Sequence, residues 1–421
     1  TILLGTAMGS TRLLYQNRRF LDEFAGALNR NRHPRRALYL TDTLRDRNGV
    51  SSSLSGKLRE VQRRDLPIDF LICHADAEEE PHLHVLRPLD SFSLEGFGGQ
   101  ELRIPDLMHI SRVFYEGGYD RVICSTEGPM AVVALVLKHM FNVPCYFFMH
   151  TDWLDFIAHN TDLNQHERDR VRRMLRFFYN QFSGVFVLNR EHRDWLVGHQ
   201  MQLDAERVML TAHHVEQPVV KLAKMAKRDL LDGLDDDAPT LIYAGRLSRE
   251  KGLDELPGIL QRVREQIPDI KLVLCGTGPY GAELQRRLPE AIFTGWVDKH
   301  LLGQLYTSLD LMVFPSRFDT FGTVVLEAFC NGMPVIAYDC KGPRDIIQHG
   351  VNGFLADDAE HIAGLIVDYF ANRVQQQAMR DNAIRRAGEY NATEIMDEFL
   401  ENLGLGPEPA RDEIVQQRLV G

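Results

Sequence analysis

The sequence lacks several features that would assign it to special protein classes. No apolar run reaches the roughly 18 residues that a membrane-spanning helix needs. The opening "TILLGTAMGSTRLL" has no basic start and precedes an arginine-rich segment, which argues against a signal peptide. None of the six cysteines forms a C-x-x-C pair, and several lie in apolar runs. These absences predict buried, reduced thiols in a cytoplasmic protein.

An excess of positive charge is also missing. The net charge of −11 argues against nucleic-acid binding through bulk electrostatics. The 44% apolar and 25% charged residues are typical of a globular protein. A chain of 421 residues predicts two domains of about 200 residues each. Because the chain begins at Thr1 without methionine, we expect that it was cut from something longer, with a fused or associated N-terminal domain as one explanation.

Short apolar runs alternate with longer helical stretches along most of the chain. This alternation is typical of βαβ units and predicts an α/β protein with two doubly wound parallel sheets. Ligands of such sheets bind beyond the carboxyl ends of the strands, so two facing domains predict a cleft between them. The predicted strands are 37–43, 69–75, 121–126, 144–150 and 184–189 in the first series, and 240–246, 271–276, 291–296, 311–316 and 334–339 in the second.

These patterns divide the chain into five parts. A Rossmann-like first domain and a Rossmann-like second domain are separated by an acidic linker and flanked by helical segments. The C-terminal segment leaves open a return to the first domain. The expected parts are an N-terminal helical extension (1–36), the first domain (37–218), the linker (219–239), the second domain (240–392) and the C-terminal helical segment (393–421).

Two strand-end loops in the second domain carry glycine and cations. In "YAGRLSREKGLDEL", Arg246 and Lys251 follow a predicted strand, where two fixed cations would suit a diphosphate. A solvated pair of loop cations is the alternative. Gly276 in "VLCGTGPYGAEL" predicts a tight turn, since a lone G-x-G is weak evidence for phosphate binding. In "FTGWV", Trp296 and Val297 could flank a flat base, although Trp296 could equally belong to the core.

The stretch "SRFDTFGTVVLEAFCNGMPV" (316–335) carries two acids eight positions apart. Its apolar part predicts a helix that stops near Gly332, and the free N–H groups at the helix start would favour an anionic or hydroxyl-rich ligand. Asp319 precedes that helix, where an ordinary N-cap is the alternative. Glu327 lies two turns further on, roughly 80° around the helix, and a pairing with an internal arginine is its alternative role.

In order and spacing, these motifs resemble those of the retaining glycosyltransferases of the GT-B fold. The resemblance is to the large group that contains phosphatidylinositol mannosyltransferases, sucrose-phosphate synthases and sulfoquinovosyl-diacylglycerol synthases. It is dense over 240–358 and looser in the first domain, where "ALYLTDTLRDRNGVSSSLSGKL" and "STEGPMAVVALVLKHMFNVPCYFFMHTDWLDF" carry it. Two departures are Asp319, where most members have glutamate, and "HHVEQP" (213–218) between the domains.

The resemblance implies a role for individual residues. Arg246 and Lys251 would hold the donor diphosphate, Glu327 the ribose hydroxyls, and Asp319 the hydroxyls of the donor sugar. His150 would lie near the reacting sugar, with Gly49 approaching the phosphate across the cleft. The implied catalytic residues are His150, Arg246, Lys251 and Asp319, and the implied donor site comprises Gly49, Arg246, Lys251, Gly276, Val297, Asp319, Thr320, Phe321, Gly322, Thr323 and Glu327.

The resemblance implies retaining transfer of a hexose from a UDP- or GDP-sugar to a hydroxyl acceptor, with no metal and no cofactor. The segment "HERDRVRRMLRFF" (166–178) has five arginines against two acids, so it could contact anionic lipid heads at the inner membrane face, or form a solvated helix face. A lipid or glycolipid acceptor therefore stays open. A nucleotide-sugar-binding regulatory protein without transfer and a sugar-nucleotide epimerase are the alternative functions.

Overall fold

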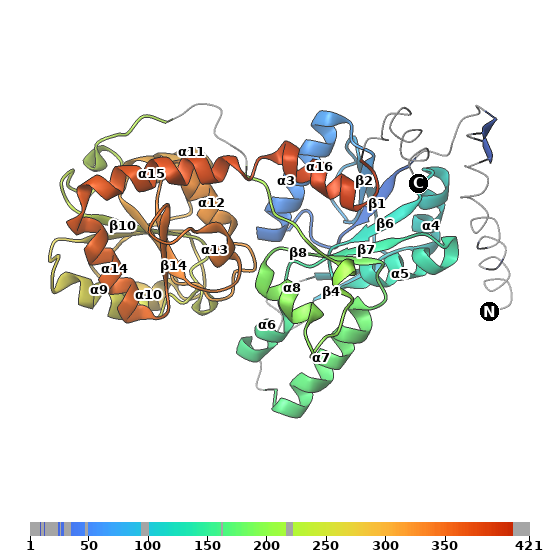
Figure 1. The fold of residues 1–421 in the computed structure, drawn as a ribbon, viewed down its shortest axis with the longest axis horizontal. Coiled ribbons are helices and arrows are strands. Elements are labelled where there is room, and N and C mark those ends of the chain that lie inside the picture. Colours follow the sequence, from blue (N-terminus) through green and yellow to red (C-terminus); the bar gives the residue numbers. More distant parts are fainter. Residues whose placement is uncertain are drawn as a thin grey trace, which may run out of the picture.

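The computed structural model describes residues 35–46, 49–93, 101–160, 163–215 and 222–406, together with isolated positions before residue 35. Most of the expected N-terminal extension (1–36), part of the linker and residues 407–421 lie outside the described residues. Two parallel sheets, each with helices on both faces, lie side by side (Figure 1). The α/β fold class predicted from the sequence is confirmed.

The first sheet has seven parallel strands in the order β3-β2-β1-β6-β7-β8-β9. Its strands are short and mostly buried, which is why they appear in the sequence as continuous apolar runs. The chain steps outward from β1 to β3 and then returns to β6 on the other side of β1, so the strand order reverses between β1 and β6. The strands are β1 (Ala37–Leu40), β2 (Ile68–Cys73), β3 (Leu83–Leu86), β6 (Arg121–Cys124), β7 (Cys145–Phe148), β8 (Gly184–Val187) and β9 (Val208–Leu210).

Helices and a small hairpin surround this sheet. Asn164 and Glu167 form a reciprocal capping box at the start of α7, and the Asn189 side chain caps α8. The elements are α3 (Gly49–Arg64), the antiparallel pair β4 (Asp90–Ser93) and β5 (Glu101–Ile104), α4 (Leu107–Glu116), α5 (Pro129–Phe141), α6 (Trp153–Asn160), α7 (Gln165–Tyr179), α8 (Arg190–Val197) and the short turn η1 (Ala205–Arg207).

The second sheet repeats this plan with six parallel strands in the order β12-β11-β10-β13-β14-β15, so its strand order reverses between β10 and β13. Its strands are β10 (Thr240–Ala244), β11 (Lys271–Cys275), β12 (Ile292–Gly295), β13 (Leu311–Phe314), β14 (Val335–Tyr338) and β15 (Gly353–Ala356). Its helices and helical turns are η2 (Lys227–Asp229), η3 (Arg249–Lys251), α9 (Leu256–Arg264), α10 (Gly281–Arg287), α11 (Lys299–Ser308), α12 (Thr323–Cys330), α13 (Lys341–Ile346), α14 (Ala359–Ala371) and α15 (Arg373–Gly388).

The last described helix, α16 (Ala392–Asn402), leaves the second domain and packs against α3 of the first (Figure 1). Arg64 on α3 forms an ion pair with Asp397 at 2.5 Å. The Phe399 ring lies 5.9 Å from the Phe148 ring at the end of β7. The chain therefore joins the two domains twice, once through the linker and once through this helix.

Each of the ten predicted strand runs contains a strand. The sequence did not predict β3, β9, β15 or the β4–β5 pair. β3 and β9 lie at the edges of their sheet, where burial is partial and the apolar signal is weak. All six cysteines are free; five are buried, as the sequence predicted, and Cys340 is half-buried.

Candidate active site

Two loops of the second domain meet where the strand order reverses. One follows β10 and the other follows β13, and both leave the carboxyl edge of the sheet. They approach so closely that a Cβ on Gly252 would lie 2.1 Å from the Pro315 carbonyl oxygen. Lys251 Nζ donates to both carboxylate oxygens of Asp319, at 2.8 and 3.0 Å. The tertiary structure thus joins a cation and an acid 68 residues apart in sequence.

Two glycine-containing turns lie at the same carboxyl edge of the sheet. A Cβ on Gly276 would lie 1.9 Å from the Gly245 carbonyl oxygen, so the turns after β10 and β11 need glycine for their close approach. Arg246 follows Gly245 with an exposed side chain. Val297 is half-buried beyond β12, whereas the side chain of Trp296 is 77% exposed and is not part of the core.

The helix carrying Glu327 starts later than an N-cap role for Asp319 would require. α12 begins at Thr323, its cap is Gly322 with φ +84°, and no side chain caps it. Asp319 instead faces Lys251, so the sequence alternative of an ordinary N-cap is wrong. Glu327 is half-buried on α12. Phe321 is buried. Gly332 follows the helix with φ +69°, as the stop signal predicted.

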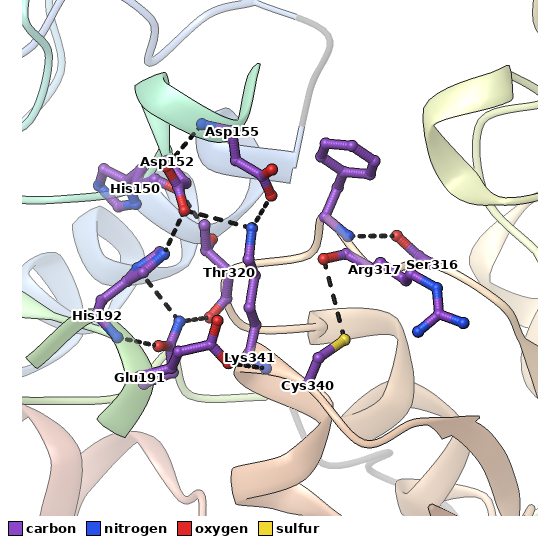
Figure 2. Close-up of polar contacts among 12 residues, drawn as sticks. His150, Asp152, Asp155, Glu191, His192, Ser316, Arg317, Thr320, Cys340 and Lys341 are labelled. Atoms are coloured by element: carbon purple, nitrogen blue, oxygen red, sulfur yellow. Dashed lines mark hydrogen bonds and ion pairs between the residues drawn. The ribbon is translucent and has the colours of Figure 1, made fainter. Parts of the chain in front are cut away.

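The loop between β13 and α12 also contacts the first domain. Thr320 Oγ1 donates to the His150 carbonyl oxygen at 2.8 Å, and Asn189 Nδ2 donates to the Thr320 carbonyl oxygen at 2.6 Å (Figure 2). The two first-domain residues follow β7 and β8, so both domains present the carboxyl edges of their sheets to this contact. His150 and Thr320, predicted separately, are thus brought together.

Lys341 forms a buried ionic contact between the domains. Its side chain, 7% exposed, points between Asp152 and Asp155 of the first domain, with Nζ 3.3 Å from Asp152 and in close contact with Asp155 (Figure 2). Asp152 also accepts a hydrogen bond from His192 at 3.1 Å. Burial raises the pKa of Asp152. The hydrogen bond from His192 and the charges of His192 and Lys341 lower it by more, so the pKa lies well below its ordinary value.

His150 is a neutral, buried ring. It stacks on Phe148 with centroids 4.6 Å apart and on His213 at 5.3 Å. Burial, assisted by the nearby charge of Lys57, lowers the pKa of His150 to about 3. Within the described part of the chain, neither ring nitrogen has a hydrogen-bond partner. An unprotonated imidazole at this position can donate or accept a hydrogen bond, but it does not supply positive charge at neutral pH.

A cavity of about 840 Å³, here called the first-domain pocket, lies where the first sheet reverses its strand order. Residues following β1, β6 and β7 form its floor, and α5, β5 and α6 supply its walls. His150 lines it, so the pocket and the contact with Thr320 share a residue. Its lining includes Asp42, Thr43, Asp46, Val50, Glu101, Leu102, Ile104, Pro105, Leu107, Ser125, Thr126, Glu127, Gly128, Pro129, Val132, Val133, Val136, His150, Thr151 and Trp153.

Four acids line this pocket, and none of them was singled out by the sequence: Asp42, Asp46, Glu101 and Glu127. The carboxyls of Asp42 and Glu127 are held by hydrogen bonds. Asp42 Oδ2 accepts from Thr126 Oγ1 at 2.5 Å, and Glu127 Oε1 accepts from Tyr179 at 2.9 Å. Burial raises the pKa of Asp42 to about 6 and that of Glu127 to about 7, in both cases against opposing hydrogen bonds. In the sequence each is one acid after an apolar run, and only the neighbouring strands bring them together.

The raised pKa of Glu127 predicts a pH-dependent stability. Below about pH 4.5 this carboxyl is protonated in both the folded and the unfolded state. As the pH rises from about 4.5 to about 7, the unfolded chain ionises it while the buried carboxyl of the folded protein keeps its proton, so stability is lost over this range. Glu127→Gln removes this cost and its amide oxygen can still accept from Tyr179. We expect the variant to be more stable than the wild type at pH 8, by about 1–3 kcal/mol, and not at pH 4.5. Urea unfolding at both pH values measures the difference; an equal effect at both would contradict it.

Gly49 begins α3 at the carboxyl edge of the first sheet and is exposed, with no atom within 4 Å of a Cβ built there. No described helix is both long and apolar enough to cross a membrane. Over the ranges that the structure describes, no three His, Cys, Asp or Glu side chains gather as metal ligands.

Comparison with known proteins identifies the family. Residues 47–213 match the family model "Glycosyltransferase Family 4" and residues 232–386 match "Glycosyl transferases group 1". The GDP-mannose-dependent alpha-mannosyltransferase of Corynebacterium glutamicum is 44% identical over 115 residues, 27% of each chain. Sulfoquinovosyl transferase SQD2 of Arabidopsis thaliana is 37% identical over 126 residues, 29% of this chain and 24% of that protein. Both matches thus span under a third of the relative's length.

A solved structure extends the likeness over nearly the whole fold. The crystal structure of HepE from Anabaena in complex with UDP superposes with a TM-score of 0.67 at 19% identity, covering 88% of this chain and 99% of that one. At this identity the likeness concerns the fold. Together, the two adjoining sequence matches and the paired Rossmann-like domains show that the chain belongs to the GT-B group of glycosyltransferases, the family that its motifs resemble.

Proposed function

We propose that this chain is a retaining, metal-independent glycosyltransferase. It moves a hexose from a nucleotide-diphosphate sugar to an acceptor hydroxyl. The observation that carries the proposal is the meeting of Lys251 and Asp319 at the strand-order reversal of the second sheet, with Thr320 beside His150 of the first domain. A donor at this crevice has a cation for its diphosphate and an acid for its sugar, and it lies next to a pocket that can hold an acceptor.

The donor is proposed to lie along the loop from Lys251 to α12. Lys251 and the exposed Arg246 neutralise the diphosphate, assisted by the backbone N–H groups of Thr320, Phe321 and Gly322. Glu327 accepts hydrogen bonds from the ribose, and Val297 contacts the base. Gly276, packed against Gly245, lets the backbone come close to the nucleotide. Thr323 begins the helix and Gly49 approaches the phosphate from the first domain.

The reaction is proposed to occur on one face of the sugar. The bond between the anomeric carbon and the phosphate oxygen breaks, the acceptor oxygen forms the new bond from the same side, and the leaving phosphate takes the acceptor's proton. Asp319 is then a sugar ligand rather than a nucleophile, in keeping with its ion pair to Lys251. The neutral His150 donates a hydrogen bond to the sugar or to the transition state.

The named relatives point to two different bases for the donor nucleotide. The C. glutamicum relative is GDP-mannose-dependent, whereas the HepE crystals contain UDP. The deciding experiment combines thermal-shift screening of UDP-, GDP- and ADP-sugars with an assay of nucleotide release. One base should raise the melting temperature and support slow donor hydrolysis. Binding without turnover across donors and acceptors would favour a regulatory nucleotide-sugar-binding protein, and donor interconversion without acceptor would favour an epimerase.

A lipid or glycolipid acceptor at the membrane surface is the proposed acceptor class. Its support is α7, where Met174 and Phe177 are 61% and 71% exposed among five arginines. Such a helix can insert its apolar side chains beside anionic lipid heads.

The double variant Met174→Ser/Phe177→Ser is therefore expected to bind vesicles containing phosphatidylglycerol about 10-fold more weakly than the wild type, because two apolar anchors are removed. Co-sedimentation measures the binding. Val374→Ser, which removes an 86% exposed apolar side chain from the second domain, is the matched control and should bind as the wild type does. Equal binding by both variants would show that α7 does not contact the membrane through these side chains.

A further inference from the structure

We propose that the first-domain pocket binds an acceptor with an apolar body, and that Asp42 and Glu127 hold hydrogen-bond-donating groups, hydroxyl or ammonium, on that acceptor. The inference rests on the proposed function and names the acceptor by its chemistry.

The pocket leads toward the reacting end of the proposed donor site. His150 and Thr151, at the end of β7, line it, and the His150 carbonyl oxygen is held by Thr320 of the second domain. Asp42 lies beyond β1, two strands away, because β6 separates β1 from β7. Neighbouring strands lie about 4.8 Å apart, so a group bound at Asp42 is roughly 10 Å from His150. That span matches one sugar ring or a short chain.

Asp42 has an unused hydrogen-bonding atom. Thr126 Oγ1 and, more weakly, the Met130 N–H at 3.4 Å donate to Oδ2, whereas Oδ1 is buried with no partner among the described residues. The carboxyl cannot easily turn away, since the backbone at Gly128 lies against it and a Cβ there would be 2.6 Å from Oδ2. A buried acceptor without a partner is costly, and a donor group on a bound ligand would satisfy it.

Glu127 is a second anchor in the same pocket. Tyr179 fixes its Oε1 at 2.9 Å, and the carboxyl follows β6, next to β1. Burial raises the pKa of Glu127 to about 7 and that of Asp42 to about 6, so Glu127 is partly protonated at neutral pH and Asp42 takes up a proton at slightly acid pH. A hydroxyl can bond to either form of a carboxyl, whereas an ammonium group stabilises the ionised form. Hydroxyl and ammonium groups are both hydrogen-bond donors, so these acids can bind either one.

The walls select for an apolar body. Val132, Val133 and Val136 of α5 face the pocket together with Leu102 and Ile104 of β5. A bare polyol would leave this surface uncovered, while an alkyl, isoprenyl or ring system would bury it. Val132 is 64% exposed and can be replaced without disturbing the core.

The test measures binding by titration calorimetry, with and without the nucleotide diphosphate that the donor screen identifies. The probes are octyl β-D-glucoside below its micelle concentration, methyl β-D-glucoside, and octyl 2-amino-2-deoxy-β-D-glucoside.

The octyl glucoside should bind at least about 10-fold more tightly than the methyl glucoside. Val132→Asp should reduce that preference. In Asp42→Asn, the side chain still accepts from Thr126 but presents an N–H where Oδ1 was. This variant should bind both octyl probes about 10-fold more weakly. Asp236→Asn, at an exposed linker acid, is the charge-matched control.

The outcomes separate the two proposals. Stronger binding of the amino probe, lost in Asp42→Asn, identifies an ammonium ligand, and equal binding of both octyl probes identifies a hydroxyl; either supports the inference. Equal binding of octyl and methyl glucosides, or octyl binding unchanged in both pocket variants, would overturn it. Donor hydrolysis is assayed in parallel. If it persists while octyl binding fails, the pocket assignment is wrong and the proposed function stands. If no donor is turned over but the probes bind as expected, the pocket assignment stands and the proposed function is wrong.

Discussion

Lys251→Ala is expected to lower the kcat/KM for donor turnover by at least about 100-fold. Lys251 Nζ lies within 3.0 Å of both Asp319 oxygens and is proposed to hold the diphosphate, so its loss removes charge-assisted hydrogen bonds that strengthen as the leaving group gains charge. Two such bonds, at about 1.5–3 kcal/mol each, account for this factor. Steady-state release of the nucleotide diphosphate measures the effect.

The matched control for this variant is in the same loop. Arg249 is also cationic, but its side chain is 65% exposed and pairs with Glu283 away from Asp319. Arg249→Ala should therefore retain activity within about threefold, since exposed ion pairs contribute little. Both variants should keep the melting temperature of the wild type within a few degrees. Full donor turnover in Lys251→Ala would show that this lysine does not hold the donor diphosphate.

Lys341→Met is expected to reduce kcat by about 10- to 100-fold and to weaken the contact between the domains. The methionine keeps the length of the side chain but leaves Asp152 and Asp155 without their cation in a largely buried interface, where breaking an ion pair costs several kcal/mol. The adjoining Gly342 packs so tightly on Phe321 that a Cβ would lie 2.2 Å from its carbonyl oxygen. A shift of Lys341 therefore moves the loop proposed to bind the sugar, and small misplacements there reduce the rate.

Arg190→Met is the comparison at the same interface. Its guanidinium is 77% exposed and lies 3.9 Å from Asp345, so its removal should change kcat by less than twofold. Thermal unfolding provides an independent measurement. Lys341→Met should separate the unfolding of the two domains or lower the common transition, while Arg190→Met should not. A double-mutant cycle of Lys341→Met with Asp152→Asn should give a coupling energy above about 1 kcal/mol. Additive effects would contradict a direct ionic contact.

The sequence by itself determined the fold class and the position of ten strands, but not β3, β9, β15 or the β4–β5 pair. Apart from the half-buried edge strand β12, the strands that it predicted are largely buried within a parallel sheet, so each is a local apolar run whose signal needs no knowledge of its neighbours. The motif order between 240 and 358 also identified the GT-B group, which the comparisons then showed. Edge strands such as β3 and β9 gave no comparable signal, because partial burial does not require a continuous apolar run.

The tertiary structure decided which side chains face one another. In the sequence, Asp319 could have been an N-cap; its pairing with Lys251 depends on how β10 and β13 lie side by side where the strand order reverses. No sequence pattern indicates a role for Lys341, the first residue of α13, because its burial between two acids exists only where the two domains meet. Asp42 and Glu127 are 85 residues apart, and adjacent parallel strands bring them into one pocket. Local patterns encode burial, whereas an ion pair or a pocket depends on strand order and domain contact, which bring together residues distant in the chain.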